Sequence, residues 1–261
     1  MQPVIETKDV LKIYETGESV IRAVDGVSLT INPGEFVGLV GPSGSGKTTM
    51  LAMIAALLNP TAGKVLLEGN DLSKMGEAQR LKYRREKIGF TFQSNNLVPY
   101  LTVQENIELM LRINNIYNQP CKERSMEMME RLGIYETRNK LPGQISGGQK
   151  QRVSIARSLI HNPSLVLADE PTASLDTERA YQVVETFADL IHEEGKAGIM
   201  VTHDLRMCQF VDRIVQMRDG KIESILTGPK EICNFIACDQ IRPEAEPVYS
   251  AYEKALEVAV A

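Results

Sequence analysis

Residues 41–49 read GPSGSGKTT and fit the pattern G-x-x-x-x-G-K-[ST]. The apolar stretch EFVGLV precedes the motif at 35–40, and the helical pattern TTMLAMIAALL follows at 48–58. A strand, a glycine-rich loop and a helix in this order can cradle a phosphate, because the glycines expose backbone N–H groups and the helix N-terminus adds its dipole. An incidental Gly/Ser surface turn is the alternative, and the flanking strand and helix argue against it. The stretch therefore predicts an α/β fold that binds a nucleotide.

Each part of this motif has an expected role. Lys47 is expected to bridge the β- and γ-phosphates, and the Thr48 hydroxyl is expected to ligate Mg²⁺. The residues expected to bind ATP here are Gly41, Pro42, Ser43, Gly44, Ser45, Gly46, Lys47, Thr48 and Thr49.

Outside the motif, apolar and β-branched runs alternate with helical patterns. The runs are VSLTI (27–31), KIGFTF (87–92), SLVLAD (164–169) and AGIMVTH (197–203). Strands separated by helices predict a largely parallel sheet. Between Gln93 and His161 no strand pattern occurs, and helical spacing predicts an insertion of helices. Its three segments are TVQENIELMLRI (102–113), CKERSMEMMERL (121–132) and GGQKQRVSIARSLI (147–160).

The run LADEP at 167–171 supplies a second half for a nucleotide-hydrolysing site. A buried strand would carry Asp169 to the carboxyl edge of the sheet, where open α/β sheets bind ligands. Asp169 is expected to hold Mg²⁺ through water, and Glu170 to polarise the attacking water as a general base. The alternative is that the two acids cap the next helix.

Composition restricts the class of protein. The 261 residues carry a net charge of −5 without a dense Lys/Arg block, which argues against a nucleic-acid partner. The four cysteines have no metal-ligand spacing, so free thiols are expected, and Cys233 and Cys238 have no assigned role. The N-terminus MQPVIETKDV lacks the features of a signal peptide. The longest apolar run, 50–58, is far shorter than the roughly 20 residues that cross a bilayer. If the chain works at a membrane, another subunit must span it.

A second Gly-rich stretch, QISGGQKQR at 144–152, also has the chemistry of a phosphate cradle. GPSGSGKTT, ISGGQ and LADEP in this order, with Gln93 before the helical segments and His203 after the last buried strand, resemble the ATP-binding cassette (ABC) ATPases. The resemblance covers residues 4 to about 226. ISGGQ replaces the family's usual LSGGQ, a change that conserves volume. The resemblance implies a P-loop NTPase core with a mainly parallel sheet, an antiparallel β subdomain and a helical subdomain.

The same resemblance implies a division of the chain. An ABC ATPase domain is expected at 1–226, with its core at 1–92 and 163–226 and a helical signature subdomain at 93–162. Residues 227–261 are expected to form a C-terminal extension of unassigned role. In it, PEAEP (243–247) reads as a linker before a short helix, AYEKALEVAVA (251–261).

Two Gly-rich cradles in one chain are explained if two subunits pair head to tail. In the ABC family the signature faces the nucleotide of the other subunit, so each cradle completes half a site. Residues implied to grip the partner's ATP are Ser146, Gly147, Gly148 and Gln149, and Asp176 matches the loop that crosses between subunits. The implied partner is a second copy of the chain or a homologous ATPase.

Three further residues match family positions one at a time. Tyr14 matches the aromatic residue that stacks on adenine, although a tyrosine on a strand face is the alternative. Gln93 matches the glutamine that reaches Mg²⁺ and the attacking water. His203 matches the histidine that contacts the γ-phosphate and helps to organise Glu170.

The leading interpretation is an ATPase subunit that drives a separate membrane permease from the cytoplasmic face of the cell membrane. GFTFQSNNLVPYLTVQENI (89–107) and LADEPTASLDTE (167–178) are similar to the macrolide-efflux, lipoprotein-release and haem-efflux ATPases, which favours export or extraction of an amphipathic cargo. An ATPase of a polar amino-acid importer is the alternative. A non-transport ABC protein acting on nucleic acid is less favoured, because only about fifty residues separate Gln93 from Ser146. The cargo itself is not encoded in this chain.

The methionines of SMEMMERL (125–132) allow two interpretations. They can fill an irregular helical core, or they can form an adaptable docking surface together with Met110.

Overall fold

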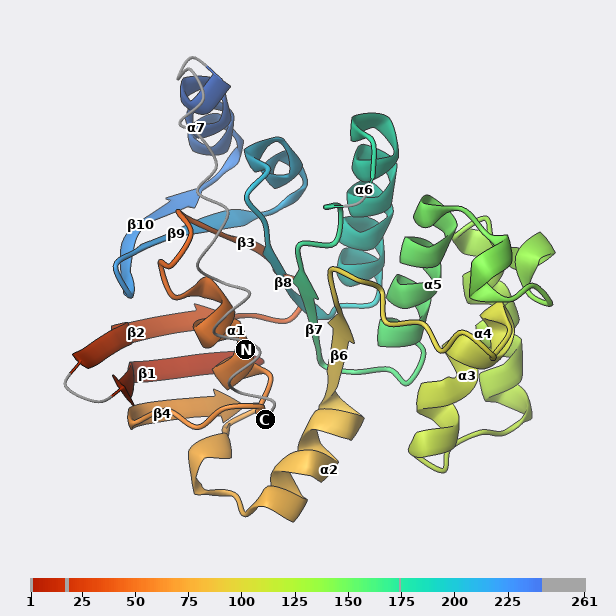
Figure 1. Ribbon diagram of the computed structural model, residues 1–261, viewed down its shortest axis with the longest axis horizontal. Helices are drawn as coiled ribbons and strands as arrows, with labels where there is room; N and C mark the ends of the chain where they lie inside the picture. The colour runs from red at the N-terminus through yellow and green to blue at the C-terminus, as the bar shows by residue number, and fades with distance from the viewer. Residues whose placement is uncertain (1, 17–18, 174, 241–261) are drawn as a thin grey trace.

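The computed structural model describes residues 2–16, 19–173 and 175–240. Its larger sheet has six strands in the order β10-β9-β3-β8-β7-β6 (Figure 1). Neighbouring strands from β9 to β6 are parallel, and β10 is antiparallel to β9, which confirms the mainly parallel sheet. The bounds are β3 Phe36–Val40, β6 Ile88–Thr91, β7 Leu165–Asp169, β8 Ala197–Val201, β9 Arg213–Arg218 and β10 Lys221–Thr227.

A second, antiparallel sheet has the order β2-β1-β4-β5 and confirms the expected β subdomain. Its strands are β1 Ile5–Thr16, β2 Ser19–Ile31, β4 Ala62–Leu67 and β5 Asn70–Asp71, followed by the 3₁₀ helix η1 Leu72–Lys74. The predicted strand at 27–31 is the end of β2.

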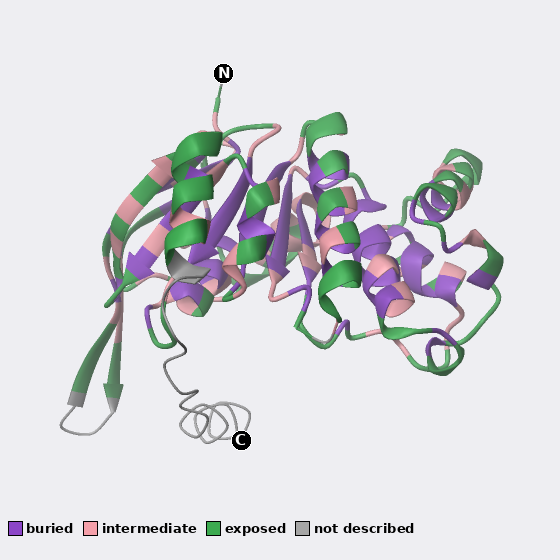
Figure 2. Cartoon of the chain, turned by 90° about the horizontal axis from the view of Figure 1, so that it is seen from above, coloured by how far each residue is buried: buried purple, intermediate pink, exposed green. Residues whose placement is uncertain are grey.

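The central strands of the six-stranded sheet, β3, β8 and β7, are buried on both faces. Successive side chains in a strand point to opposite sides, so each strand contributes to two apolar clusters. In β3, Phe36 and Val40 join the apolar cluster formed with helix α6 (Thr177–Glu193). Val37 and Leu39 join the cluster formed with helix α1 (Lys47–Ile54) and the antiparallel sheet. Figure 2 shows these buried strands between helices with exposed outer faces.

Helix α1 ends at Ile54, four residues before the end of the apolar pattern (48–58) that predicted it. Ala56 has a φ of 57°, a left-handed conformation that a right-handed helix cannot include, so the chain turns there. Helix α2 (Glu77–Lys87) was not predicted, and it buries no residue.

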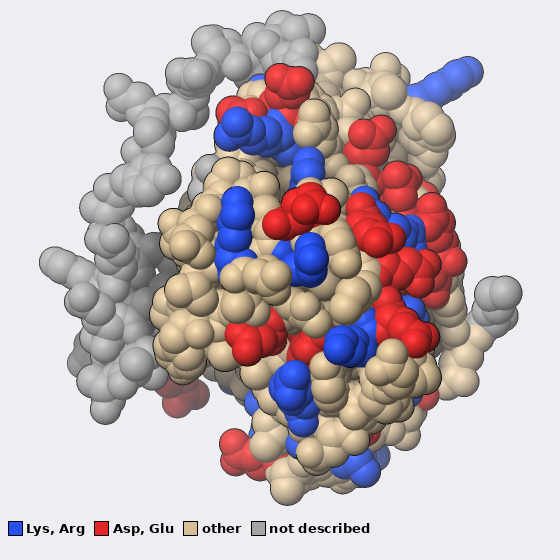
Figure 3. Space-filling view, turned by 90° about the vertical axis from the view of Figure 1, so that its right-hand side faces the viewer, with Lys and Arg blue, Asp and Glu red and all other residues tan. Residues whose placement is uncertain are grey.

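Three helices fill the predicted helical insertion: α3 Val103–Ile113, α4 Gln119–Arg131 and α5 Gly147–Leu159. Each begins at a side-chain cap, supplied by Thr102, Asn118 and Ser146 respectively. Short 3₁₀ helices, η2 Tyr135–Thr137 and η3 Pro142–Gln144, connect α4 to α5. Figure 3 faces this end of the molecule, where basic and acidic side chains are interspersed.

Two of the methionines in this region belong to the apolar core. Met128 is 3% exposed and Met129 is fully buried, while Met110 and Met126 pack against the same cluster partly buried. This packing favours the core-filling interpretation of SMEMMERL.

The chain after β8 forms the 3₁₀ helix η4 (Leu205–Phe210) and, beyond β10, helix α7 (Pro229–Gln240). Ile232 of α7 is 4% exposed, and Phe235 and Ile236 pack against the core cluster that includes η4 residues Met207 and Cys208. The expected linker at 243–247 and helix at 251–261 lie outside the described residues. All four cysteines are free thiols, as expected. In the described part of the chain, no helix has the length and apolar character that crossing a membrane requires.

Candidate active site

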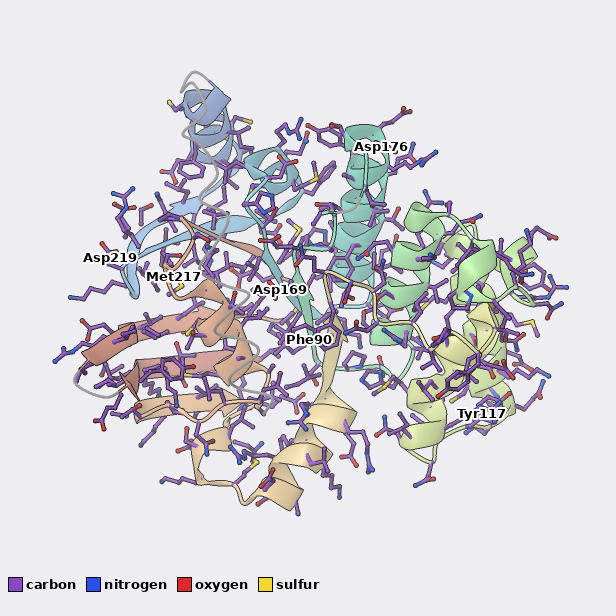
Figure 4. All side chains as sticks on the ribbon, viewed as in Figure 1. Phe90, Tyr117, Asp169, Asp176, Met217 and Asp219 are labelled. Carbon is purple, nitrogen blue, oxygen red and sulfur yellow. The ribbon has the colours of Figure 1, made fainter. Side chains whose placement is uncertain are left out.

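Four neighbouring parallel strands, β3, β8, β7 and β6, each lead directly into a segment that the sequence singled out. The Gly-rich loop follows β3, His203 lies two residues beyond β8, Asp169 ends β7 and Gln93 lies two residues beyond β6. Because the carboxyl ends of parallel strands share one edge of a sheet, these segments gather along that edge. Figure 4 marks Asp169 at this edge.

The Gly-rich loop curls around the ammonium group of Lys47. Lys47 Nζ donates to the carbonyl oxygens of Gly41 at 2.8 Å and Pro42 at 2.9 Å, and to Ser45 Oγ at 3.2 Å. Gly46 precedes α1 in a left-handed conformation and supplies no side-chain cap. The first N–H groups of α1 therefore have no side-chain acceptor, which suits a phosphate at this helix N-terminus.

Two glycines of the loop cannot carry a side chain. A Cβ on Gly41 would lie 2.0 Å from Met217 O, and a Cβ on Gly46 would lie 2.1 Å from Ala23 O. Both residues also have positive φ, 146° and 96°. Glycine at these two positions lets β9 and β2 pack directly against the loop.

The turn between β9 and β10 supports the loop from behind, and sequence reasoning missed it. Gly220 N donates to Ser45 O at 3.1 Å, while Gly220 O accepts from Asp25 N at 2.8 Å. Figure 4 labels Met217 and Asp219 at this turn. The available signal was the dipeptide Asp219-Gly220 between two apolar runs, a pattern typical of hairpin turns.

The site combines one buried cation with two carboxylates. Burial lowers the pKa of Lys47, against the opposing influence of the Glu170 and Asp169 charges. Burial raises the pKa of Asp169, and the neighbouring charge of Glu170 raises it further, while Lys47 counteracts both. Because like charges at close range repel, the two carboxylates favour an additional cation nearby.

Glu170 and His203 lie in direct contact, with Glu170 Oε1 3.1 Å from His203 Nδ1. Glu170 N donates to Val201 O at 2.9 Å, so the backbone extends the pairing of β7 and β8 past the end of β7. Glu170 has a φ of 47°, which is unusual for a residue that carries a side chain.

The chain neighbours of His203, Thr202 and Asp204, bond to each other, and the sequence did not single out either one. Asp204 N donates to Thr202 Oγ1 at 3.0 Å, and the Asp204 carboxylate caps η4 by accepting from Arg206 N at 3.1 Å. Arg206 also pairs with Asp204 through its guanidinium at 2.8 Å and 2.7 Å. These bonds restrain the residues on either side of His203, whose own side chain is 69% exposed.

The segment at 146–149 lies apart from the Gly-rich loop. Ser146 Oγ accepts from Gln149 N at 3.3 Å, and Gln149 Oε1 accepts from Ser146 N at 2.9 Å, which together cap α5. The hydroxyl proton of Ser146 and the N–H groups of Gly147 and Gly148 stay available to a ligand. Within residues 2–16, 19–173 and 175–240, no hydrogen bond or ion pair joins this segment to 41–49.

The start of α6 is the neighbour of this segment. A Cβ on Gly148 would lie 3.7 Å from Arg179 Cδ. Asp176 caps α6 by accepting from Arg179 N at 3.0 Å and forms an ion pair with the Arg179 guanidinium at 3.3 Å. The structure thus brings Asp176 close to the signature segment rather than to Lys47.

The remaining two site residues are accessible. Tyr14 is 40% exposed on the β1–β2 hairpin, opposite Ile21, and Lys12 Nζ lies 5.2 Å from its ring centroid. Ala23, two residues beyond Ile21, contacts Gly46, so the hairpin adjoins the loop. Gln93 is exposed within the turn that follows β6, which the bond from Asn95 N to Phe92 O closes.

The side chains available for Mg²⁺ are oxygen donors, the Thr48 hydroxyl, the Asp169 carboxylate and the Gln93 amide, and this is the donor set that Mg²⁺ prefers. Among the described residues no group of three or more His, Cys, Asp or Glu side chains could hold a metal ion by itself. The donor set therefore fits an ion that completes its coordination with nucleotide phosphates and water.

Residues 24–173 match the family model described as ABC transporter. The chain is 39% identical to the lipoprotein-releasing system ATP-binding protein LolD of Hyphomonas neptunium, over 85% of this chain and 97% of LolD. It is 43% identical to the putative hemin import ATP-binding protein HrtA of Staphylococcus aureus, over 82% of this chain and 97% of HrtA. These relatives confirm the predicted resemblance to lipoprotein-release and haem ATPases.

A solved structure shares the fold. It is the dimeric ATP-binding cassette MJ0796 of Methanocaldococcus jannaschii in a post-hydrolysis state bound to ADP and Pi. The TM-score is 0.77 at 39% identity, over 85% of this chain and 98% of the other.

Proposed function

This chain belongs to the ABC transporter family and hydrolyses ATP, and we propose that it powers a separate membrane permease through head-to-tail pairing of two ATPase subunits. The observation that supports the pairing is the separation of the two phosphate-binding segments. Loop 41–49 and segment 146–149 make no hydrogen bond or ion pair to each other within the described residues, although both offer free N–H groups. A second subunit can bring one segment to the other.

In the proposed reaction, water attacks the γ-phosphorus of ATP. Glu170 accepts the proton of that water as the new P–O bond forms, and the bond between the γ-phosphorus and the bridging oxygen breaks to release ADP and phosphate. His203, 3.1 Å from Glu170, orients this carboxylate. Lys47 and the N–H groups at the start of α1 hold the β- and γ-phosphates.

Mg²⁺, held by Thr48, by Gln93 and through water by Asp169, would neutralise charge on the phosphates. Tyr14 offers a ring for adenine on the hairpin beside the loop.

The proposed contacts across the subunit interface come from Ser146, Gly147, Gly148 and Gln149, which would grip the γ-phosphate of the partner's ATP. Asp176 lies beside this segment and would cross to the other subunit with it. Because these donors bind the γ-phosphate and not ADP, hydrolysis would weaken the pairing. ATP binding and hydrolysis would then close and open the attached permease.

Mixing two inactive variants tests the composite site. Lys47→Ala removes the phosphate ligand of one half, and Ser146→Arg blocks the other half. In a mixed dimer both defects fall in one site and the second site is intact, so an equal mixture should recover about a quarter of wild-type activity. Normal hydrolysis by Ser146→Arg alone would contradict a shared site.

Thr102→Arg is a matched control for Ser146→Arg. Thr102 caps α3 with the same pair of reciprocal bonds, to Glu105, but lies outside the proposed interface. This variant should lose cap stability and keep its activity, which separates helix capping from phosphate binding.

For the transport direction, we propose export or extraction of an amphipathic cargo such as haem, a drug or a lipoprotein. The release named for LolD supports this direction, whereas the import named for HrtA is of the opposite direction but of an amphipathic cargo, hemin, and not of a polar amino acid. The proposed location is the cytoplasmic face of the cell membrane, through the permease. Co-purification with a permease from detergent extracts tests the partnership. ATP-dependent uptake of haem, but not of polar amino acids, into inside-out vesicles tests the direction.

A further inference from the structure

Arg157, in the last turns of α5, carries a buried guanidinium that the proposed reaction does not use. The residue is 9% exposed, and no Asp or Glu within the described ranges lies within ion-pair distance of it. Burial lowers the pKa of Arg157. A buried cation without a carboxylate is costly to keep, so stability alone does not explain the residue.

The guanidinium bonds the backbone of the turn that follows Gln93. Arg157 donates through one terminal nitrogen to Asn96 O at 2.8 Å and through the other to Asn95 O at 2.7 Å. Ser154, one helical turn earlier, adds a longer bond from its hydroxyl to Asn95 O at 3.4 Å. The planar fork of an arginine suits two adjacent carbonyl oxygens.

The turn itself has a conformation that needs support. Asn95 and Asn96 have φ values of 59° and 43°, the left-handed region that side chains other than glycine seldom adopt. Asn95 N donates to Phe92 O at 3.0 Å, and Asn96 N donates to Ser94 O at 2.7 Å. Gln93 therefore lies in a turn with β6 on one side and, on the other, the Asn95 and Asn96 carbonyls that Arg157 binds.

We propose that Arg157 is a positioning residue for Gln93, because it holds the 94–96 turn against α5 and so fixes where Gln93 leaves β6. The inference rests on the proposed role of Gln93 at the site. Since α5 also begins at Ser146, Arg157 links the turn of one site to the helix that serves the partner's site.

A double-mutant cycle in the full-length chain tests this role, with kcat and KM for ATP measured separately. Arg157→Met should lower kcat at least about tenfold with a smaller change in KM, because Lys47 and the N–H groups of α1 still hold the phosphates. Adding Arg157→Met to Gln93→Ala should lower kcat no further, because both changes remove the same contribution. Hydrogen exchange at the amides of 94–96 should be faster in Arg157→Met.

Arg152→Met is the matched control, since Arg152 lies on the same helix and donates to Leu132 O and Gln182 Oε1 instead of to the turn. It should keep the wild-type kcat. Arg157→Lys retains a hydrogen-bond donor and should hydrolyse ATP faster than Arg157→Met. If Arg157→Met does not fold, Arg157→Lys takes its place in the cycle.

The possible results distinguish a failure of the role proposed for Gln93 from a failure of the role proposed for Arg157. Wild-type turnover in Gln93→Ala would remove Gln93 from the proposed reaction, and the role of Arg157 with it. A slow Gln93→Ala combined with additive losses in the cycle would overturn the role of Arg157 alone.

Discussion

Glu170 Oε1 lies 3.1 Å from His203 Nδ1, and the two residues follow neighbouring parallel strands. The backbone bond from Glu170 N to Val201 O fixes this pair before any ligand arrives. Glu170 is 27% exposed and His203 is 69% exposed, so water reaches the carboxylate, and the imidazole is placed where it would orient it. The pair therefore has the geometry of a general base with its orienting partner.

Glu170→Gln should lower kcat by about 10²–10⁴-fold, because the amide keeps the size of the side chain and loses the base. The affinity for ATP should stay within a few-fold of wild type, and the ATP-bound dimer should accumulate in size-exclusion chromatography. Glu185→Gln, an exposed change on α6, is the control and should behave as wild type. Normal turnover in Glu170→Gln would remove this residue from the role of base.

Gly41→Ala should destabilise the protein by more than about 2 kcal/mol and weaken ATP binding, because its Cβ would overlap Met217 O. Gly44→Ala is the comparison, since a Cβ there meets nothing within 4 Å although its φ is +79°. Gly44→Ala should lower the free energy of unfolding by only about 1–2 kcal/mol, the strain of a side chain in the left-handed region. Chemical denaturation and ATP titration measure both effects, and equal stability of the two variants would contradict the overlap.

Protonation of His161 should lower the free energy of unfolding at acidic pH. Its side chain is 6% exposed, neither ring nitrogen makes a hydrogen bond of normal geometry within the described residues, and burial lowers its pKa to about 4. The unfolded chain therefore binds one more proton than the folded chain between about pH 6.5 and pH 4. The contribution of neutral His161 to the free energy of unfolding is complete above about pH 6.5. It declines by about 3 kcal/mol as the pH falls from about 6.5 to about 4.

The measurement for His161 is the denaturation midpoint from pH 7 to pH 4. His161→Gln should show a shallower decline than wild type, because it removes the buried group that takes up a proton on unfolding. Identical slopes in the two proteins would show that His161 does not titrate as its burial requires.

Ile232→Ala should lower the free energy of unfolding by about 2–4 kcal/mol, because Ile232 is buried where α7 packs on the core. Cys233→Ala, at the exposed neighbouring position, should change it by less than about 0.5 kcal/mol. Thermal unfolding compares the two variants. A negligible effect of Ile232→Ala would mean that α7 contributes nothing to the stability of the core.

The buried parts of the fold could be predicted from the sequence. β3, β6, β7 and β8 begin within one residue of their apolar runs because both of their faces are covered. β1 escaped prediction because register shifts between Thr7 and Val10 and again before Lys12 break its alternation. β10 was missed because its residues are only exposed or half-buried, and α2 because it buries none.

The sequence could point to candidate site residues where they lie in a short motif or match a single position of the family pattern, as Tyr14, Gln93 and His203 do. Loop 41–49, Asp169 and Glu170 lie in short motifs with known chemistry. Met217 and Arg157 act through contacts with segments far away in sequence, and no local pattern marks such contacts. Whether the motif residues perform their assigned roles stays a prediction that the variants above test.

The Gly-rich loop lies at the seam between two sheets, since Ala23 of one and Met217 of the other each leave no space for a methyl group there. A small shear of one sheet against the other would press on this loop before it broke any bond inside either sheet. The apolar cluster between the sheets sets their spacing, and it would therefore also influence how closely the loop surrounds a bound nucleotide. Substitutions in this apolar cluster should therefore change the affinity for ATP, although they lie far from the phosphates.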